Sequence, residues 1–333
     1  MKFIIKFLTL LLLLNIAVYS QSVNYVGTSA ANFLKIGVGA KFVGSGESDI
    51  TLSEDASSLA WNPGAISRIE KNNVVFSYIG WLVNTNVSYL SFVMPSDFIT
   101  LGMDITYFSS GDIEETTLLR QEGTGRVFSA NDLSLGFAVA KNLTDRFSVG
   151  VKVKYLREQL ASVTSSAFGI DIGSVFTTSF LNDMKIGIAL TNFGTSMKFE
   201  GIDLLVSHNV PGSPTGKQIP AVLDTKEWSI PLTFKIGLAS TLISMKDYKM
   251  DLSYTITDSR DNDARHNIGT AMKFLDIFTI RGGYRFNYDE VTFSLGSGVE
   301  LNTSFAGDIS FDYAYTDFGD LKDIHQFTLG IKF

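Results

Sequence analysis

Hydrophobic side chains recur at every second position in one segment after another of this 333-residue chain. The final residues show the pattern clearly, because Phe327, Leu329, Ile331 and Phe333 alternate with small or polar residues. Side chains alternate across a strand, so the pattern predicts one apolar face and one polar face. Such a strand at the edge of a soluble sheet would promote aggregation. It suits a closed barrel whose apolar face meets lipid, and the alternative is the last strand of a soluble sandwich.

Charged residues on the opposite faces of the other predicted strands favour the barrel. They alternate with apolar residues and are interleaved with Gly, Ser, Thr and Ala. Charges of this kind are costly in a sandwich core and costly against lipid. They are reasonable in a hydrated lumen, so we expect lumen-facing side chains at Asp132, Lys152, Lys154, Asp171, Lys235, Asp251, Arg281, Arg285, Asp308 and Asp312.

The count and spacing of the segments give a second test of the barrel. About fourteen strands are expected, centred near residues 76, 90, 103, 135, 151, 171, 188, 234, 252, 269, 282, 296, 310 and 328. If the N-terminus is periplasmic, the connections between strands lie alternately on the external side and the periplasmic side of the membrane. The longest ones, near Ser109–Val127, Glu158–Thr164 and Gly194–Glu227, all fall outside. Bacterial outer-membrane barrels have even strand numbers, short periplasmic turns and longer external loops. The sequence therefore predicts an all-β fold, a membrane-spanning antiparallel barrel over residues 71–333.

The first twenty residues are typical of a secretory signal peptide. Lys2 and Lys6 precede an apolar run, and small or permitted residues at Val18 and Ser20 predict cleavage before Gln21. The run is shorter than the roughly 20 residues that a helical anchor needs. We therefore expect residues 1–20 to be removed, and the mature protein to lie in the bacterial outer membrane against lipid and lipopolysaccharide.

The composition offers little for catalysis, metals or nucleic acid. Removing Lys2 and Lys6 changes the formal charge from −7 to −9, which does not favour nucleic-acid binding. The chain has no cysteine, and His208, His266 and His325 lack ligand spacing. We therefore expect no enzyme activity, no cofactor and no metal site.

Two loop motifs resemble sites but favour solvated loops. The segment Gly212–Gln218 is one residue short of a phosphate loop, contains Pro214, and lacks Ser or Thr after Lys217. An acidic group predicted on an outer loop could bind calcium, but a solvated loop is the favoured interpretation. This group consists of Asp258, Asp261 and Asp263.

Residues 21–70 do not alternate and are rich in glycine. Ser53 is predicted to cap a short helix with Glu54 and Asp55 in its first turn, and Pro63 must end that helix. A wide barrel needs a filled lumen, and glycine lets a backbone pack closely. The sequence therefore predicts an N-terminal hatch, containing a short helix, inside the barrel, with Trp61 near the periplasmic end.

The motifs of this segment carry a family resemblance. Gly39-Ala40-Lys41, Gly44-Ser45-Gly46-Glu47 and the stretch Glu54–Gly64 resemble the N-terminal hatch of FadL-type outer-membrane barrels, most closely the PorV/PorQ branch. Gly64 stands where FadL-type hatches usually have Ala. The resemblance implies a fourteen-stranded barrel plugged by its N-terminus. The residues that carry this motif are Glu54, Asp55, Ala56, Trp61, Asn62, Pro63 and Gly64.

The resemblance implies two functions. PorV-type proteins serve type IX secretion and carry the C-terminal signal domains of exported cargo at the cell surface, so secretion proteins and cargo are expected partners. FadL passes long-chain fatty acids or other hydrophobic compounds, which implies a hydrophobic ligand in the lumen. An outer-membrane enzyme is a third hypothesis, disfavoured because no nucleophile motif occurs. The C-terminal residues Phe327, Leu329, Ile331 and Phe333 are expected to form the assembly signal.

Overall fold

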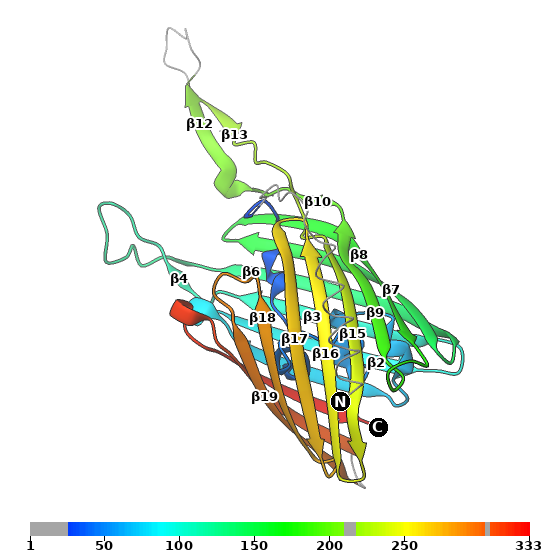
Figure 1. The fold of residues 1–333 in the computed structure, drawn as a ribbon. Coiled ribbons are helices and arrows are strands. Elements are labelled where there is room, and N and C mark those ends of the chain that lie inside the picture. The colour runs from blue at the N-terminus through cyan, green and yellow to red at the C-terminus, as the bar shows by residue number, and fades with distance from the viewer. Residues whose placement is uncertain (1–25, 210–217, 304–306) are drawn as a thin grey trace.

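The computed structural model describes residues 26–209, 218–303 and 307–333. These residues form a closed antiparallel barrel (Figure 1). The main sheet contains 15 strands, of which the two-residue β11 (Glu200–Gly201) pairs only with β8, so fourteen strands form the wall. The predicted signal peptide and most of the segment Gly212–Gln218 lie outside the described residues. No helix in the described part of the chain is long and apolar enough to cross a membrane.

Each predicted strand centre falls within a different barrel strand, which confirms the expected number. Every neighbouring pair runs antiparallel, and pairing of β8 with β9 and of β1 with β21 closes the ring. The strands are β1 (Asn73–Gly80), β2 (Asn86–Pro95), β3 (Thr100–Ser109), β6 (Ala130–Thr144), β7 (Phe147–Leu160), β8 (Val163–Thr177), β9 (Lys185–Gly194), β15 (Thr233–Met245), β16 (Tyr248–Ser259), β17 (Asn262–Phe274), β18 (Phe278–Phe286), β19 (Phe293–Thr303), β20 (Gly307–Thr316) and β21 (Ile324–Lys332).

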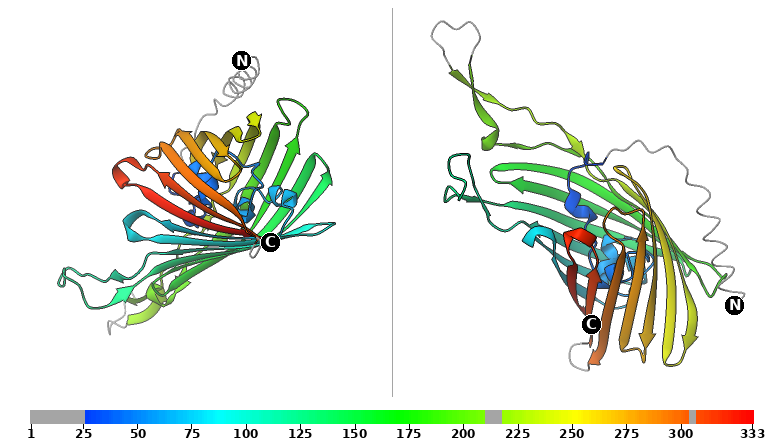
Figure 2. Two further views of the ribbon diagram at one scale, coloured as in Figure 1. Left: turned by 90° about the horizontal axis from the view of Figure 1, so that it is seen from below. Right: turned by 60° about the vertical axis from the view of Figure 1, so that its left-hand side comes forward.

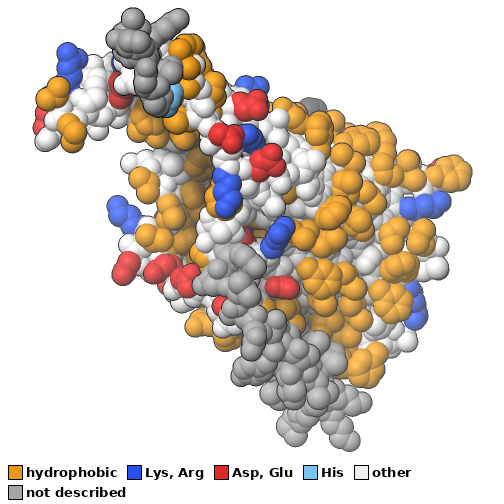
Figure 3. Space-filling model, turned by 90° about the horizontal axis from the view of Figure 1, so that it is seen from above, with side chains coloured by type: hydrophobic (Ala, Val, Ile, Leu, Met, Phe, Trp, Pro, Cys, Tyr) orange, Lys and Arg blue, Asp and Glu red, His pale blue; other side chains and the backbone are white. Residues whose placement is uncertain are grey.

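The alternation of the last strand matches the two faces of the wall. Phe327 and Leu329 are 45% and 43% exposed on the outer face, whereas Gln326 and Thr328 are each 1% exposed on the inner face. Figure 3 shows hydrophobic side chains spread over the outer wall of the barrel. An apolar outer surface and a polar inner surface are what a lipid-embedded barrel requires.

The two ends of the barrel carry connections of different length. Longer connections at one end contain β4 (Ile113–Glu114), β5 (Val127–Phe128), β10 (Ser196–Met197), η5 (Ile202–Leu204), β12 (Leu205–Asn209), β13 (Gln218–Val222), β14 (Trp228–Ser229), and the 3-10 helices η4 (Leu82–Asn84) and η6 (Gly319–Leu321). We call this the loop end and the opposite end, with its short turns, the turn end.

Two loop predictions were wrong. The connection expected over Glu158–Thr164 is only Ala161-Ser162, because the ladder between β7 and β8 continues to Leu160 and Val163. The predicted acidic loop is likewise reduced to two residues, one of which is Asp261. Asp258 and Asp263 belong to the strands on either side, so the three carboxylates do not share a loop.

The N-terminal segment lies inside the ring of strands (Figure 2). It contains the 3-10 helix η1 (Asn32–Lys35), the helix α2 (Ala40–Gly44), and the 3-10 helices η2 (Ala56–Ala60) and η3 (Ala65–Arg68). The helix predicted from Ser53 is instead the 3-10 helix η2, which begins at Ala56. Asp55 has extended backbone angles and caps it, since its carboxylate accepts a hydrogen bond from the Ser57 amide at 2.9 Å.

The segment runs from the loop end to the turn end. The Ala30 amide donates to the carbonyl of Ser229 in a long connection, whereas the Arg68 guanidinium donates to the carbonyl of Arg146 in a short turn. A periplasmic start was expected, so the direction is the reverse of that prediction. The predicted alternation of short and long connections is unaffected, because β1 still begins at the turn end. We call residues 26–38 the strap and residues 39–72 the plug.

Candidate functional site

Direct contacts between glycine backbones join the plug to the inner wall. Gly44 and Gly46 of the plug face Gly296 of β19 and Gly283 of β18. A Cβ atom on Gly44 would lie 2.8 Å from the Gly296 Cα, and one on Gly46 would lie 2.9 Å from the Gly283 Cα. Because real Cβ atoms do not approach this closely, glycine is required for the plug to seat against this side of the wall.

A buried charge cluster ties the same side of the plug to the wall. Lys41 in α2 is 3% exposed, and its Nζ lies 3.1 Å from Asp55 Oδ2 and 3.9 Å from Asp312 Oδ2 of β20. Arg281 of β18 lies 2.9 Å from the other oxygen of Asp312. Burial opposes the charge on Lys41, but the carboxylates of Asp55, Asp312 and Glu54 outweigh it and raise the pKa of Lys41. The ammonium group therefore stays charged and holds two carboxylates from different parts of the chain.

A second charge cluster lies on the opposite side of the lumen. Lys152 Nζ lies 2.9 Å from Asp104 and 3.4 Å from Asp171, and it donates to the plug carbonyl of Leu59 at 3.1 Å. Lys154 lies 2.8 Å from Asp171. Lys152, Lys154 and Asp171 face the lumen as predicted, but they are buried and paired instead of hydrated. The plug occupies the space where water was expected.

The hatch motif is concentrated where η2 ends. Trp61 is 5% exposed, stacks on Phe42 at 5.2 Å, and donates from Nε1 to the Val38 carbonyl at 2.9 Å. The Asn62 carboxamide accepts from the Gly64 amide at 2.9 Å and closes a tight turn.

The rest of the motif lies along the same path. The Ala56 amide donates to the Asn73 side chain at 2.8 Å, and the exposed Glu54 lies 3.7 Å from Lys41. The backbone of Pro63 and Gly64 lies against Gly150 and against Gly173, respectively. The contacts of Ala56, Pro63 and Gly64 lie toward the turn end, whereas the Trp61 ring faces the loop end.

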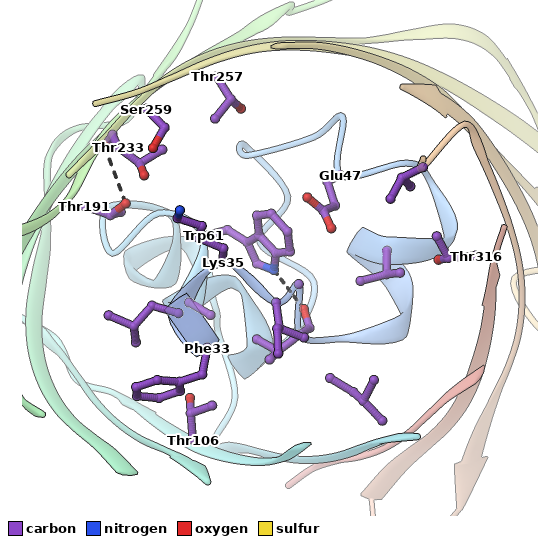
Figure 4. A pocket seen from close by; sticks show the side chains of 18 of the residues that line it. Phe33, Lys35, Glu47, Trp61, Thr106, Thr191, Thr233, Thr257, Ser259 and Thr316 are labelled. Atoms are coloured by element: carbon purple, nitrogen blue, oxygen red, sulfur yellow. Dashed lines mark hydrogen bonds between the residues drawn. The ribbon is translucent and has the colours of Figure 1, made fainter. Parts of the chain in front are cut away.

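A cavity of about 400 Å³ lies between the strap, the plug and the wall, on the loop side of Trp61 (Figure 4). Lys35 and apolar residues of the strap line one side, and the ammonium of Lys235 lies 4.4 Å from the centre of the Trp61 ring. The wall contributes a series of hydroxyl groups, from Thr106, Ser134, Thr191, Thr233, Thr257, Ser259 and Thr316. Charged side chains, among them Glu47, Lys154 and Arg285, also line the cavity, so its surface combines apolar strap and plug residues with a polar and charged wall.

The sequence did not identify the strap as part of this site. Phe33 and Ala31 of the strap belong to a buried cluster with Leu156, Ala167 and Ile230 of the barrel and its loops. The sequence indicated only that this stretch is not a strand, because its apolar and polar residues do not alternate. Among the described residues, no group of three or more His, Asp or Glu side chains is arranged to hold a metal ion.

The residues of the expected assembly signal lie on the outer face of the closing strand. Phe327 of β21 pairs in register with Tyr78 of β1, and Leu329 pairs with Phe76. Phe333 is 58% exposed, and its amide donates to the Asn72 carbonyl at 2.9 Å. The segment therefore completes the ring.

Comparison with known proteins gives a family and a fold. Residues 19–210, more than half of the chain, match the family described as type IX secretion system protein PorV. A search of curated proteins finds no match.

Solved structures with the same architecture include several outer-membrane channels. A FadL homologue from Pseudomonas aeruginosa is 12% identical with a TM-score of 0.56, covering 90% of this chain and 98% of that one. The toluene transporter TbuX from Ralstonia pickettii is 11% identical with a TM-score of 0.55, covering 89% and 97%. The toluene transporter TodX from Pseudomonas putida is 12% identical with a TM-score of 0.53, covering 94% and 99%. At this identity the likeness concerns the fold alone.

Proposed function

The chain belongs to the PorV family of type IX secretion proteins, and from this premise we propose that it acts as a non-enzymatic docking protein for exported cargo. It is a β-barrel of the bacterial outer membrane that serves type IX secretion. The proposed cargo contact is the C-terminal signal domain of the exported protein, bound at the cell surface.

One observation carries this proposal: the lumen is filled by the chain's own N-terminal segment. Lys41 of that segment pairs with Asp312 of the wall, and Lys152 of the wall donates to the Leu59 carbonyl of the segment on the opposite side. Breaking a buried ion pair is strongly destabilising. A polypeptide conduit through this barrel would require the plug to leave, which separates Lys41 from Asp312 and breaks the hydrogen bond from Lys152 to Leu59. Cargo binding at the cell surface, by the connections of the loop end, is compatible with the filled lumen.

The loop end offers apolar contact surface. Leu118 and Leu119 are 93% and 97% exposed in a turn between hydrogen-bonded Thr117 and Arg120. A second projecting hairpin exposes further apolar side chains, namely Leu205, Val222 and Leu223. Large apolar side chains exposed on loops of a rigid scaffold favour a protein-binding role.

We propose that residues 21–70 act as the hatch and residues 71–333 as the barrel. Support comes from the contacts of the hatch motif, in which Trp61, Asn62 and Pro63 all pack against the wall or the strap. We propose Phe327, Leu329, Ile331 and Phe333 as the assembly signal, because the first three lie on the strand that closes the ring and Phe333 directly follows it.

A second candidate function is passage of a hydrophobic compound, since the structures of the same fold include the toluene transporters TbuX and TodX. The cavity of about 400 Å³ with its apolar strap side supports it. The plug beneath the cavity weighs against it, because buried contacts of Lys41 and Asn62 fix the plug to the wall.

The test replaces Leu118 and Leu119 together by Ser. Cargo attachment at the cell surface should fall severalfold, because two anchor side chains are lost. Phe98→Ser is the matched control, since Phe98 is 79% exposed but lies in a turn at the other end of the barrel. Unchanged cargo attachment in the double variant, with normal folded barrel on gels, would argue against docking through this loop. Mild-detergent purification with stoichiometric hydrophobic ligand and no secretion protein would favour the second candidate.

A further inference from the structure

We propose that the strap is a releasable latch that closes the cavity toward the cell exterior, while the plug stays fixed beneath it. The cavity would then exchange its contents with the outside of the cell and not with the periplasm. This inference concerns access to the cavity and is independent of the docking role.

The strap and the plug are held by different kinds of contact. Both ends of the plug are fixed by buried groups: Lys41 lies between two carboxylates, and Asn62 donates to the Ser174 carbonyl of β8 at 3.0 Å. The plug also seats on glycines that leave no space between two backbones. Moving it would expose paired charges and break backbone packing together.

The strap is held by apolar packing of Phe33 and Ala31 against the wall and by polar contacts at the loop end, where one acidic residue accepts two of them. Asp261, in the connection between β16 and β17, accepts hydrogen bonds from Lys35 Nζ and Ser29 Oγ. The ammonium side of this pair is partly open to solvent, since the Lys35 side chain is 29% exposed and that of Asp261 is 3% exposed. Two further bonds, from the amides of Ala30 and Ala31, attach the strap to the Ser229 carbonyl and the Glu158 carboxylate.

The boundary between strap and plug is a glycine in a conformation that other residues rarely adopt. Gly39 has φ +84° and ψ 107°, and a Cβ there would lie 2.7 Å from Ser57 Oγ. Glycine adopts positive φ values without the steric cost that a Cβ atom brings. Gly39 therefore permits a sharp change of direction where the latch meets the fixed part, as a hinge requires.

Lifting the strap would uncover the cavity. Phe33, Leu34 and Ile36 of the strap form its apolar side. Phe33 also belongs to the buried cluster that contains Ala167 of β8, which is 3% exposed. Ala138 of β6 is buried as well, at 0%, but its cluster includes Leu59 and Ile66 of the plug. These two alanines report separately on the strap and the plug.

The experiment uses cysteine labelling, because the natural chain has no cysteine. Ala167→Cys and Ala138→Cys are expressed separately, and intact cells are treated with a maleimide on a linear polymer too large to cross the outer membrane. Adding Asp261→Asn should speed labelling at position 167 about tenfold, the factor expected for losing one charge-assisted hydrogen bond. Labelling at position 138 should stay slow.

The controls separate a latch from general loosening. Asp263→Asn changes an exposed carboxylate two residues away and should leave both labelling rates unchanged. Lys35→Met should reproduce the effect of Asp261→Asn, and the double variant should be no faster than either single one. A heat-modifiable gel band verifies folding of each variant. The proposal is overturned if Asp261→Asn leaves the rate at position 167 unchanged, if position 138 labels equally fast, or if labelling requires access from the periplasm.

Discussion

The side-chain amide of Asn62 donates to the backbone carbonyl of Ser174 at 3.0 Å, joining the plug to a barrel strand 112 residues later in the chain. The same amide group donates to the plug carbonyl of Ile50 at 3.1 Å. One side chain thus connects two parts of the plug to the wall, and the contacts of Pro63 lie beside it.

Replacing Asn62-Pro63 by Ala-Ala should loosen the plug without unfolding the barrel, because the strand ladder is untouched. The expected result is higher sensitivity of cells to bulky antibiotics, with a normal heat-modifiable band on gels. Asn182→Ala is the control, since Asn182 also bonds a backbone carbonyl, that of Thr241, but does so in a turn. Equal antibiotic sensitivity in the two variants would show that Asn62 does not secure the plug.

Replacing Lys41 by Met should lower the free energy of unfolding by about 3–5 kcal/mol, because Asp55 and one oxygen of Asp312 lose their buried partner. Urea titration followed by gel shift measures the change. Lys71→Met is the control: Lys71 pairs with Asp308 at 2.9 Å but its side chain is 55% exposed, so the urea midpoint should change little. Similar losses in both variants would contradict the assigned role of Lys41.

Gly283→Ala should destabilise the protein by about 1–3 kcal/mol, the usual cost of overpacking. The added Cβ would collide with the backbone of Ser45 in the plug. The neighbouring Gly282 faces outward, where the nearest atom to a new Cβ is a Leu295 methyl at 3.8 Å. Gly282→Ala should therefore change the urea midpoint little, and a larger effect at Gly282 than at Gly283 would count against the packing argument.

The latch should weaken in acid. Burial alone would raise the pKa of Asp261, but hydrogen bonds from Lys35, Ser29 and Ser259 lower it to about 2. A carboxyl group with a lowered pKa stabilises the closed form above its ordinary value near 4 and loses that effect as the pH falls toward 2. Hydrogen exchange of residues 26–38, corrected for intrinsic rates, should accelerate between pH 4 and about 2. In Asp261→Asn the same amides should exchange fast at every pH, and a persistent acid dependence there would assign the effect to another group.

Phe333→Ala should reduce the amount of folded barrel in cells more than it reduces the stability of barrel already folded. Phe333 is exposed, so its removal costs little packing, yet it completes the closing strand beside Asn72. Phe286→Ala is the control, because Phe286 is also exposed, at 45%, near the end of another strand. The measurement compares heat-modifiable protein from cells with urea midpoints of purified protein. Equal cellular yields of the two variants would remove the special role of Phe333.

The predicted sheet was accurate because its signal is local. Alternation of apolar and polar residues, as in Phe327 to Phe333, needs no knowledge of the partner strand to specify a face. Loop lengths were less accurate where polar residues continue a ladder, as at Glu158 and Thr164. Polar side chains on the inner face and polar side chains in loops look alike in sequence, and only the hydrogen-bonding partner distinguishes them.

The sequence by itself determined the barrel, its strand number and the inward direction of Lys152, Asp171 and Arg281, since period-two alternation fixes which side of a strand each residue occupies. Only the tertiary structure decided that these charges are buried and paired, that the N-terminal segment enters from the loop end, and that Asp261 holds it. The physical reason is the range of the interactions. Lys35 and Asp261 are 226 residues apart, and Lys41 and Asp312 lie farther apart still. Contacts over such separations depend on how the closed ring positions its inner wall around the segment that fills it, which no short sequence pattern contains.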